Sequence, residues 1–321
     1  MSRKNKPILE SKALGHIIAV GFFILLGYSL FIASSNMNYI WKWNSVPKYF
    51  AYQKDITIQA PFDGKVVLKN GIIEVKGEDG VKDFKISKDY KVLVDNNDDV
   101  YEDDDLATYT TWKQGPILNG LFVTLKISGL ALIIAFVLAS ILAFMRISNY
   151  YFLKDIATFY IAVIRGTPLL VQIFIFYFII ATIFNIERFY AGAISLGLFY
   201  GAYIAEVLRG AIQSIDKGQT EAAKSLGMNY VQTMGSIIMP QAFKRALPTL
   251  IGEMIALVKD SSLVSVISIT DLTKVGREIV ANTFSPFETW LVIAAIYFAI
   301  TFTLSIIGRR IENKMKKQGG M

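Results

Sequence analysis

Few side chains in this sequence could do covalent or metal chemistry. Its 321 residues include no cysteine and one histidine. These counts exclude disulfides, thiolate nucleophiles and Cys-ligated metal centres, and they leave a histidine-based metal or catalytic cluster without ligands. No Gly-x4-Gly-Lys-Ser/Thr phosphate loop occurs, so the chain cannot supply ATPase chemistry by that route. The residues therefore disfavour an enzyme.

Ionisable side chains occur instead inside apolar stretches of the sequence: Arg165, Glu206, Arg209, Lys259 and Asp260. A charge at membrane depth costs at least a few kcal/mol unless it is paired or faces water, so each is a functional candidate. Structural alternatives stay open. Arg209 and Lys259 can extend to the inner water boundary, Asp260 can pair with Lys259 or another helix, and Glu206 can fix helix packing through a salt bridge.

The composition indicates a membrane protein, because 53% of the residues are hydrophobic, 18% are charged and the mean hydropathy is +0.43. The net charge of +7 is attributed to membrane flanks rather than to a nucleic-acid surface. A spanning helix needs about 20 mainly apolar residues. Six stretches meet or approach this length: Ile17–Ala33, Pro116–Met145, Ile156–Phe184, Tyr190–Leu208, Leu247–Ile269 and Glu288–Ile307.

Basic residues at both ends of the chain predict the orientation, since Lys and Arg near span ends stay in the cytoplasm. Arg3, Lys4, Lys6 and Lys12 precede the first span, and Arg309, Arg310, Lys314, Lys316 and Lys317 follow the last. Both termini are expected to be cytoplasmic, which places the segment after the first span outside. The first span fits an uncleaved anchor, and a cleaved signal peptide is the alternative.

The outside segment is predicted to form a small all-β domain. Short β-branched runs alternate with the turn dipeptides Asp63-Gly64, Asn70-Gly71, Asp79-Gly80 and Asp95-Asn96. Ala60-Pro61-Phe62-Asp63-Gly64 resembles the barrel-sandwich hybrid of biotinyl and lipoyl domains, but no hairpin with a modified lysine stands upstream. The acidic residues from Asp98 to Asp105 suggest either a solvated turn or a Ca²⁺ site, and their spacing lacks the features of an EF-hand loop.

A polar segment of about 38 residues after Leu208 is predicted to lie in the cytoplasm as a helix-turn-helix. Gly218 to Gly227 is predicted to be a short helix, with Thr220 as its N-cap and Gly227 as its left-handed end. A second helix is expected from Met228 to Ile238, ending near Pro240. The small Ala222-Ala223 face permits close approach to a groove on another protein.

This loop resembles the cytoplasmic signature of binding-protein-dependent ABC importer permeases. The family pattern is Glu-Ala-Ala-x3-Gly-x9-Ile-x-Leu-Pro, and the matching residues are Glu221, Ala222, Ala223, Gly227, Ile237, Met239 and Pro240, with Met239 in place of Leu. Further segments resemble the polar amino acid branch, the histidine/glutamine-type permeases. They are Gly120–Leu125, Arg165–Gln172, Ala202–Ile212, Met239–Ala242 and Lys259–Leu263, where Ser261 replaces the usual Thr. The resemblance runs from about Pro116 to Lys317.

The resemblance implies an all-α polytopic fold of the ABC type I importer permeases, to which the first span and the small all-β domain are additions. It implies a multi-pass protein of the bacterial cytoplasmic membrane that moves polar amino acids. The implied partners are two ATPase subunits, a second permease subunit in a homo- or heterodimer, and an extracytoplasmic amino acid-binding protein. The chain itself would need no cofactor, because ATP and Mg²⁺ would sit on the ATPase.

Two sets of site residues follow from this resemblance. Glu221, Ala222, Ala223, Gly227 and Pro240 would couple the permease to the ATPase. An amino acid carries a carboxylate and an ammonium, so the translocation path is expected to use donors such as Arg165 or Gln172 and an acceptor such as Glu206, near a kink at Thr167-Pro168. The alternative functions are a secondary amino acid transporter and a membrane-anchored adaptor protein.

The predicted organisation has four parts. Residues 1–35 form the cytoplasmic N-terminus and first span, and 36–114 form the extracytoplasmic β domain. Residues 115–310 form the permease transmembrane domain, with the coupling loop at 210–247, and 311–321 form a cytoplasmic tail.

Overall fold

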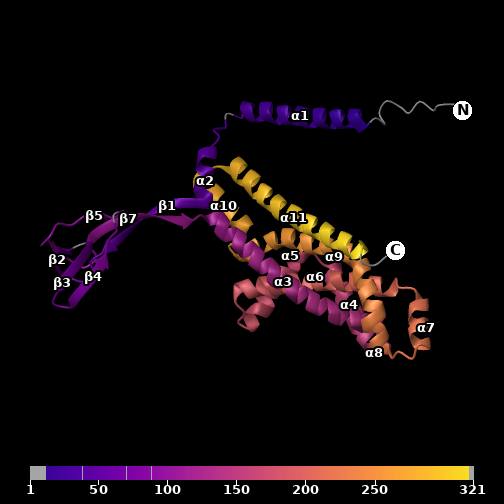
Figure 1. The fold of residues 1–321 in the computed structure, drawn as a ribbon. Coiled ribbons are helices and arrows are strands. Elements are labelled where there is room, and N and C mark those ends of the chain that lie inside the picture. The colour runs from indigo at the N-terminus through magenta and orange to yellow at the C-terminus, as the bar shows by residue number, and fades with distance from the viewer. Residues whose placement is uncertain (1–11, 38, 70, 88, 318–321) are drawn as a thin grey trace. The chain divides into compact units, whose positions relative to one another are not determined.

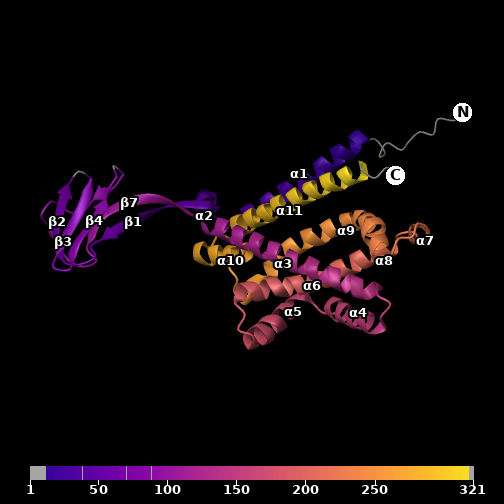
Figure 2. The same ribbon diagram turned by 60° about the horizontal axis from the view of Figure 1, so that its bottom comes forward.

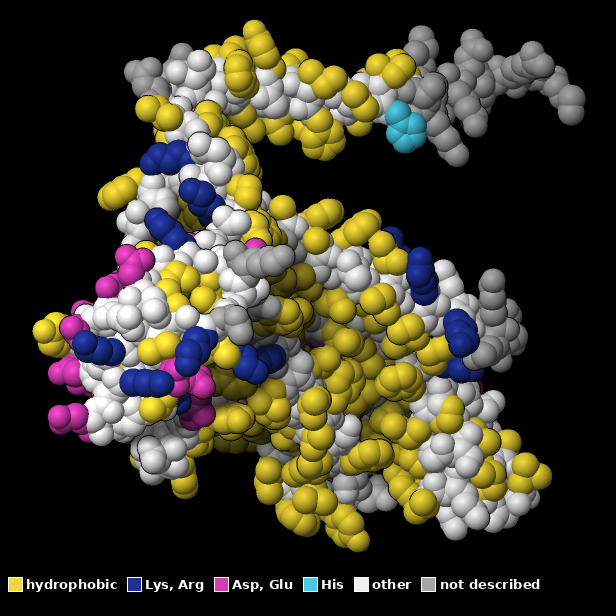
Figure 3. Space-filling model, turned by 60° about the vertical axis from the view of Figure 1, so that its left-hand side comes forward, with side chains coloured by type: hydrophobic (Ala, Val, Ile, Leu, Met, Phe, Trp, Pro, Cys, Tyr) yellow, Lys and Arg dark blue, Asp and Glu magenta, His cyan; other side chains and the backbone are white. Residues whose placement is uncertain are grey.

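The computed structural model describes residues 12–37, 39–69, 71–87 and 89–317. The predicted basic flank at Arg3, Lys4 and Lys6 lies outside these residues. The chain divides into two units, Met1–Trp43 and Asn44–Met321. In the described part of the first unit, helix α1 (Lys12–Asn36) is apolar and long enough to cross a membrane from Leu14 to Ser35. Hydrophobic side chains cover its exposed surface (Figure 3).

The second unit begins with a short 3₁₀ turn and helix, followed by seven strands (Figure 1). A three-stranded sheet has the order β1-β7-β5, and a four-stranded sheet has the order β4-β3-β2-β6. Every pairing is antiparallel. The elements are η2 (Trp43–Ser45), which starts at the unit boundary, α2 (Val46–Phe50), β1 (Ala51–Gln59), β2 (Gly64–Lys69), β3 (Ile72–Gly77), β4 (Gly80–Lys85), β5 (Lys91–Val92), β6 (Asp99–Val100) and β7 (Asp105–Gln114).

Alternating burial along β2 and β3 builds the core between the two sheets. Val66, Ile73 and Val75 are fully buried there together with Leu106 of β7. Carboxylates of the acidic loop accept hydrogen bonds from backbone N–H groups, Asp98 from Asp95 and Asp104 from Tyr101, each at 2.7 Å. Both hydrogen bonds join residues three positions apart, as in tight turns. Within the described residues no group of three acidic or histidine side chains is placed to hold a metal ion.

The rest of the second unit is helical (Figure 2). Its longest helices are α3 (Pro116–Ile147), α6 (Arg188–Gln213), α9 (Met239–Asp260) and α11 (Pro286–Lys317). The remaining elements are α4 (Tyr151–Gly166), α5 (Leu169–Ile175), η3 (Phe176–Ala181), α7 (Lys217–Ser225), α8 (Tyr230–Gln232), η4 (Thr233–Ile238), η5 (Ser261–Ile267) and α10 (Leu272–Thr283).

Helices α3 and α6 pack closely because α6 has glycines at the contact. A Cβ atom at Gly197 would lie 2.6 Å from the Ile134 side chain, and one at Gly201 would lie 2.8 Å from the Leu138 side chain. Small residues let two helix backbones approach in this way. Leu196, Ile204 and Ile173 complete a largely apolar core between these helices and α5.

The expected kink at Thr167-Pro168 is confirmed, because the chain bends by 109° between α4 and the helical stretch Leu169–Ala181. Pro168 has no N–H group and disfavours helical backbone at Thr167, which is extended. Within the described residues, four helices have the length and composition of a membrane span, or up to five spans if the bent pair counts as one.

The prediction of a continuous apolar span over Leu247–Ile269 is wrong. Helix α9 ends at Asp260, η5 follows, and Ser268 adopts a left-handed backbone with φ 62°. The break falls at the polar run Lys259-Asp260-Ser261-Ser262, where α9 gives way to η5 and the Tyr200 hydroxyl holds the Asp260 carboxylate.

Candidate functional site

Helix α7 lies in the predicted coupling loop, and its two ends are defined by specific residues. The Asp216 side chain caps its start by accepting a hydrogen bond from the Gly218 backbone N–H at 2.6 Å. Gly227 follows its end with φ 77°, as predicted. The prediction of Thr220 as the N-cap is wrong, since Thr220 lies inside the helix. Asp216 begins the helix one turn earlier because its carboxylate satisfies an otherwise unpaired N–H group.

The segment after Gly227 differs from the predicted second helix. Asn229 and Gln232 form a reciprocal capping box around the start of α8, and the π-helix η4 continues into α9 without a stop. The prediction that this helix ends near Pro240 is therefore wrong. Pro240 lies at the start of α9, directly after the π-helix η4, and helical backbone continues on both sides of it.

The signature residues divide between an exposed and a buried face. Ala223 is buried, whereas Glu221, Ala222 and Gly227 are exposed. Beside them, three large hydrophobic side chains are exposed: Leu226 by 81%, Val231 by 77% and Tyr230 by 68%. We call this set, with Glu221 and Ala222, the coupling surface. Exposed apolar residues grouped in this way are typical of a protein interface.

The signature did not predict these three apolar residues as part of the site. The sequence offered one signal for them. They are apolar residues in an otherwise polar segment, and their spacing does not place them on one buried helix face. A small core supports the loop from behind, made of Ile212, Ile215, Ile238 and Ala242. Met239 packs against this core, so its exchange for the usual Leu keeps the side-chain volume nearly constant.

Glu206 bridges two arginines near the C-terminal ends of α3 and α6. Its carboxylate accepts from Arg146 Nε at 3.2 Å and from Arg209 Nη2 at 2.8 Å. Arg209 also donates to Gln213, and Arg146 donates to Thr158 of α4. These contacts match the helix-packing alternative for Glu206.

The other three residues of the expected translocation path lie at the α4–α5 bend. Gln172 Nε2 donates to the Ile164 carbonyl at 2.7 Å and to Thr167 Oγ1 at 2.7 Å, across the break. The Arg165 guanidinium lies 5.1 Å from the centre of the Tyr203 ring, a cation–π distance. Arg165 therefore lies beside Tyr203, whereas Glu206 is paired with Arg146 and Arg209.

Asp260 pairs with another helix, which was one of the alternatives. The hydroxyl of Tyr200 on α6 donates to Asp260 Oδ2 at 2.6 Å. This bond ties the end of α9 to the middle of α6, and Lys259 beside it is exposed.

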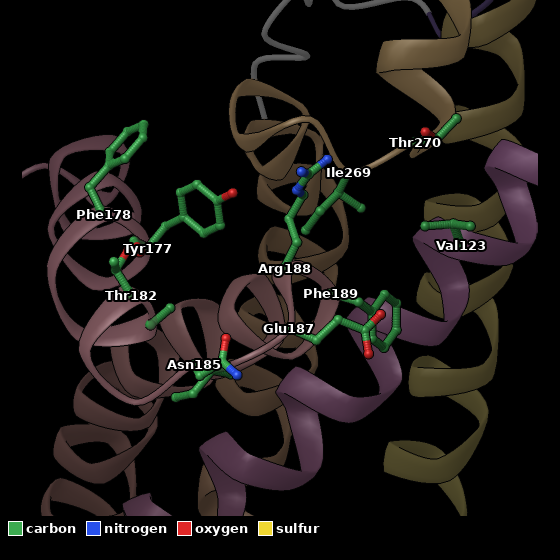
Figure 4. A pocket seen from close by; sticks show the side chains of 12 residues that line it. Val123, Tyr177, Phe178, Thr182, Asn185, Glu187, Arg188, Phe189, Ile269 and Thr270 are labelled. Carbon is green, nitrogen blue, oxygen red and sulfur yellow. Dashed lines mark hydrogen bonds between the residues drawn. The ribbon is translucent and has the colours of Figure 1, made fainter.

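A separate pocket of about 730 Å³ lies where the end of η3 meets the start of α6 (Figure 4). Tyr177, Asn185 and Arg188 contribute polar groups to it, and Arg188 donates to the Ser268 carbonyl at 3.5 Å. Thr270 also lines the pocket, and the next residue, Asp271, caps α10 by accepting from two backbone N–H groups. Burial raises the pKa of Asp271, although those donors act in the opposite direction.

Comparison with known proteins identifies the family. Residues 131–317 match the model of the binding-protein-dependent transport system inner membrane components. This chain belongs to that family. The permease is 40% identical over 209 residues to the glutamine transport system permease protein GlnP of Escherichia coli K12, covering 64% of this chain and 95% of the relative. It is 38% identical over 202 residues to the arginine transport system permease protein ArtQ of Bacillus subtilis, covering 62% and 92%.

Solved structures agree with this assignment. The permease matches a crystal structure of an amino acid ABC transporter with histidines at 41% identity, with a TM-score of 0.58, over 62% of this chain and 94% of the other. An inward-facing MetNI methionine ABC transporter shares the fold at 17% identity, with a TM-score of 0.54 and coverage of 62% and 95%. The helical part therefore has the ABC type I permease fold, and the family match leaves out α1 and the seven strands.

Proposed function

We propose that this permease subunit forms the membrane pathway of an ATP-driven importer for polar amino acids. The observation that carries the proposal is the alignment of nearly the full length of glutamine and arginine permeases with its helical part. The match to an amino acid ABC transporter structure at 41% identity supports the same substrate class. A bacterial cytoplasmic membrane location, with both termini inside and the β strands outside, follows the distribution of basic residues.

The coupling surface is proposed to bind the ATPase subunits. Helix α7 projects Glu221 and Ala222 outward, and Leu226, Tyr230 and Val231 extend the same exposed surface. An ATPase groove that covers these apolar groups would remove them from water, which favours association. Closure of the ATPase dimer on ATP would then move α7 and, through the small core behind it, α6 and α9.

The other partners are proposed from the family. A second permease subunit would complete the pathway, and an extracytoplasmic binding protein would deliver the amino acid. ATP and Mg²⁺ belong to the ATPase subunits in this proposal, and no cofactor is assigned to the permease.

The substrate path keeps Arg165 as its proposed carboxylate donor, because its guanidinium is exposed beside Tyr203. Thr167 and Gln172 are proposed to act indirectly, by holding the bend that positions Arg165. Glu206 as an acceptor for the ammonium stays a prediction, and its two arginine partners would have to release it first.

Reconstituted uptake tests the proposal. The permease, its ATPase and its binding protein are placed in proteoliposomes, and accumulation of labelled amino acids is measured with ATP enclosed or omitted. We expect ATP-dependent accumulation of one or a few polar amino acids, and a weaker apparent affinity in Arg165→Gln. Uptake that follows an ion gradient and ignores ATP would support a secondary transporter instead.

A further inference from the structure

A second pocket, of about 610 Å³, lies between the α3–α4 connection and the loop that carries α7. Three of its lining residues are basic: Arg146 on α3, Lys154 on α4 and Lys217 on α7. Gln213, Thr220 and Tyr230 add polar groups. Among the described residues that line it there is no aspartate or glutamate, so the pocket concentrates positive charge from three helices.

Lys154 and Lys217 are exposed and form no ion pair within the part of the chain that the structure describes. Arg146 differs from the two lysines, because its Nε group is paired with the Glu206 carboxylate. Cations that converge on one hollow without carboxylates attract an anion and supply several N–H donors to it.

The start of α4 adds to this positive field. Helix α4 has 16 residues and no side-chain cap at Tyr150, so backbone N–H groups of its first turn lack a capping acceptor. Ser148, Asn149 and Lys154, which flank this start, line the pocket. The positive end of the helix dipole therefore acts together with the lysines.

Aromatic residues indicate the depth of the pocket in the bilayer. Tyr150, Tyr151 and Phe152 are exposed by 67%, 82% and 62% directly beside the pocket residues Asn149 and Lys154. Exposed tyrosines at the end of a span are typical of the headgroup region. Under the proposed orientation this is the cytoplasmic leaflet, whose anionic lipids attract basic pockets.

We propose that this pocket binds a phosphate-bearing anion, supplied by the headgroup of an anionic phospholipid of the inner leaflet. The phosphate bridges Lys154 on α4 and Lys217 on α7, and so links the coupling helix to the membrane surface. The site shares Tyr230 with the coupling surface and goes beyond the proposed transport function, although the lipid source rests on the proposed cytoplasmic placement of the loop.

The test uses the delipidated permease–ATPase complex. Binding of phosphatidylglycerol, phosphatidylcholine and inorganic phosphate is measured by native mass spectrometry and by thermal shift. The double variant Lys154→Gln/Lys217→Gln is compared with Lys224→Gln, which removes an exposed lysine from the same helix α7 but not from the pocket. Uptake by the unsubstituted complex is assayed in parallel, so a failure of lipid binding is distinguishable from a failure of the transport proposal.

We expect phosphatidylglycerol to bind more tightly than phosphatidylcholine, and the double variant to lose about 30-fold of that affinity, from about 1 kcal/mol per lysine. Lys224→Gln should keep the affinity. Stabilisation by inorganic phosphate that disappears in the double variant, without preference among lipids, would keep the anion site and assign it to free phosphate. Equal losses in the double variant and in Lys224→Gln, or no response to any of the anions, would overturn the proposal.

Discussion

Gly227 is the residue whose backbone most directly shapes the coupling surface. Its φ of 77° is left-handed, and a Cβ atom there would meet nothing within 4 Å. Gly227→Ala therefore introduces backbone strain without a clash, about 1–2 kcal/mol. We expect fraying at the end of α7 and a severalfold lower substrate-stimulated ATPase rate in the reconstituted complex.

The matched control is Gly235→Ala. Gly235 also has open space around its Cα but is not left-handed. An unchanged ATPase rate in Gly227→Ala, or an equal loss in both variants, would show that the left-handed end of α7 has no special role.

A substitution at Glu206 distinguishes a role in helix packing from a role in substrate binding. Its partners retain side-chain exposures of only 19% and 25%, so removing its charge leaves two poorly solvated arginines. Glu206→Gln should destabilise the permease by about 2 kcal/mol, the scale of a hydrogen bond between charged groups. The measurement is the apparent melting temperature of the purified complex, together with the KM for uptake.

Glu278→Gln is the control, because Glu278 pairs with Lys274 while 52% exposed and should contribute at most about 1 kcal/mol. An unchanged melting temperature in Glu206→Gln with a raised KM would contradict the packing role and restore the substrate role.

Residue types in the sequence predicted the left-handed end of α7 but not the ion pairs of Glu206. Gly227 was predicted from its chemistry, because a left-handed helix end selects glycine. The partners of Glu206 were not predictable, since Arg146 is 60 positions away and only the packing of α3 on α6 brings it close. Leu226, Tyr230 and Val231 were missed because apolar residues in a polar segment are a weak signal, and only the structure shows that these three are exposed.

At the scale of elements, the start of α7 gives the sharpest test. Asp216→Ala removes the capping carboxylate and should cost about 1 kcal/mol of helix stability, whereas Asp216→Asn should keep the cap. Thr220 lies inside the helix, so Thr220→Ala should have little effect. Hydrogen–deuterium exchange over Lys217–Ser225 measures the difference. Faster exchange in Thr220→Ala than in Asp216→Ala would contradict the assigned cap.

Elements with strong local signals were predictable. The apolar runs became α1, α3, α6 and α11, and Pro168 marked the bend. The prediction for Leu247–Ile269 failed because an apolar average does not show that α9 ends at Asp260 and that η5 follows. The predicted helix end near Pro240 failed because η4 runs directly into α9, and the local residue pattern does not predict helical backbone on both sides of a proline.

At the scale of the whole molecule, the seven strands and the helices have separate cores. The Gly115 N–H donates to the Phe50 carbonyl at 2.6 Å, so the two ends of the strand-bearing segment lie together. Replacing Ala51–Gln114 by a short Gly-Ser linker should therefore leave the melting temperature of the helical part nearly unchanged.

The variant for comparison is a second deletion, which removes α2 as well as the strands. Tyr49 of α2 is buried against Ile117, Leu272 and Val275, so its loss opens a cavity in this core and should lower the melting temperature. Equal effects of the two deletions would show that the strands themselves support the helices.

The most direct test of the central claim is ATP-driven accumulation by the unsubstituted complex and by Gly227→Asp, measured side by side in proteoliposomes. Gly227→Asp adds backbone strain and a charge to the surface proposed to meet the ATPase. We expect accumulation in the unsubstituted complex only when ATP is enclosed, and its loss in the variant although both complexes assemble. Accumulation without ATP, or equal accumulation in the variant, would contradict it.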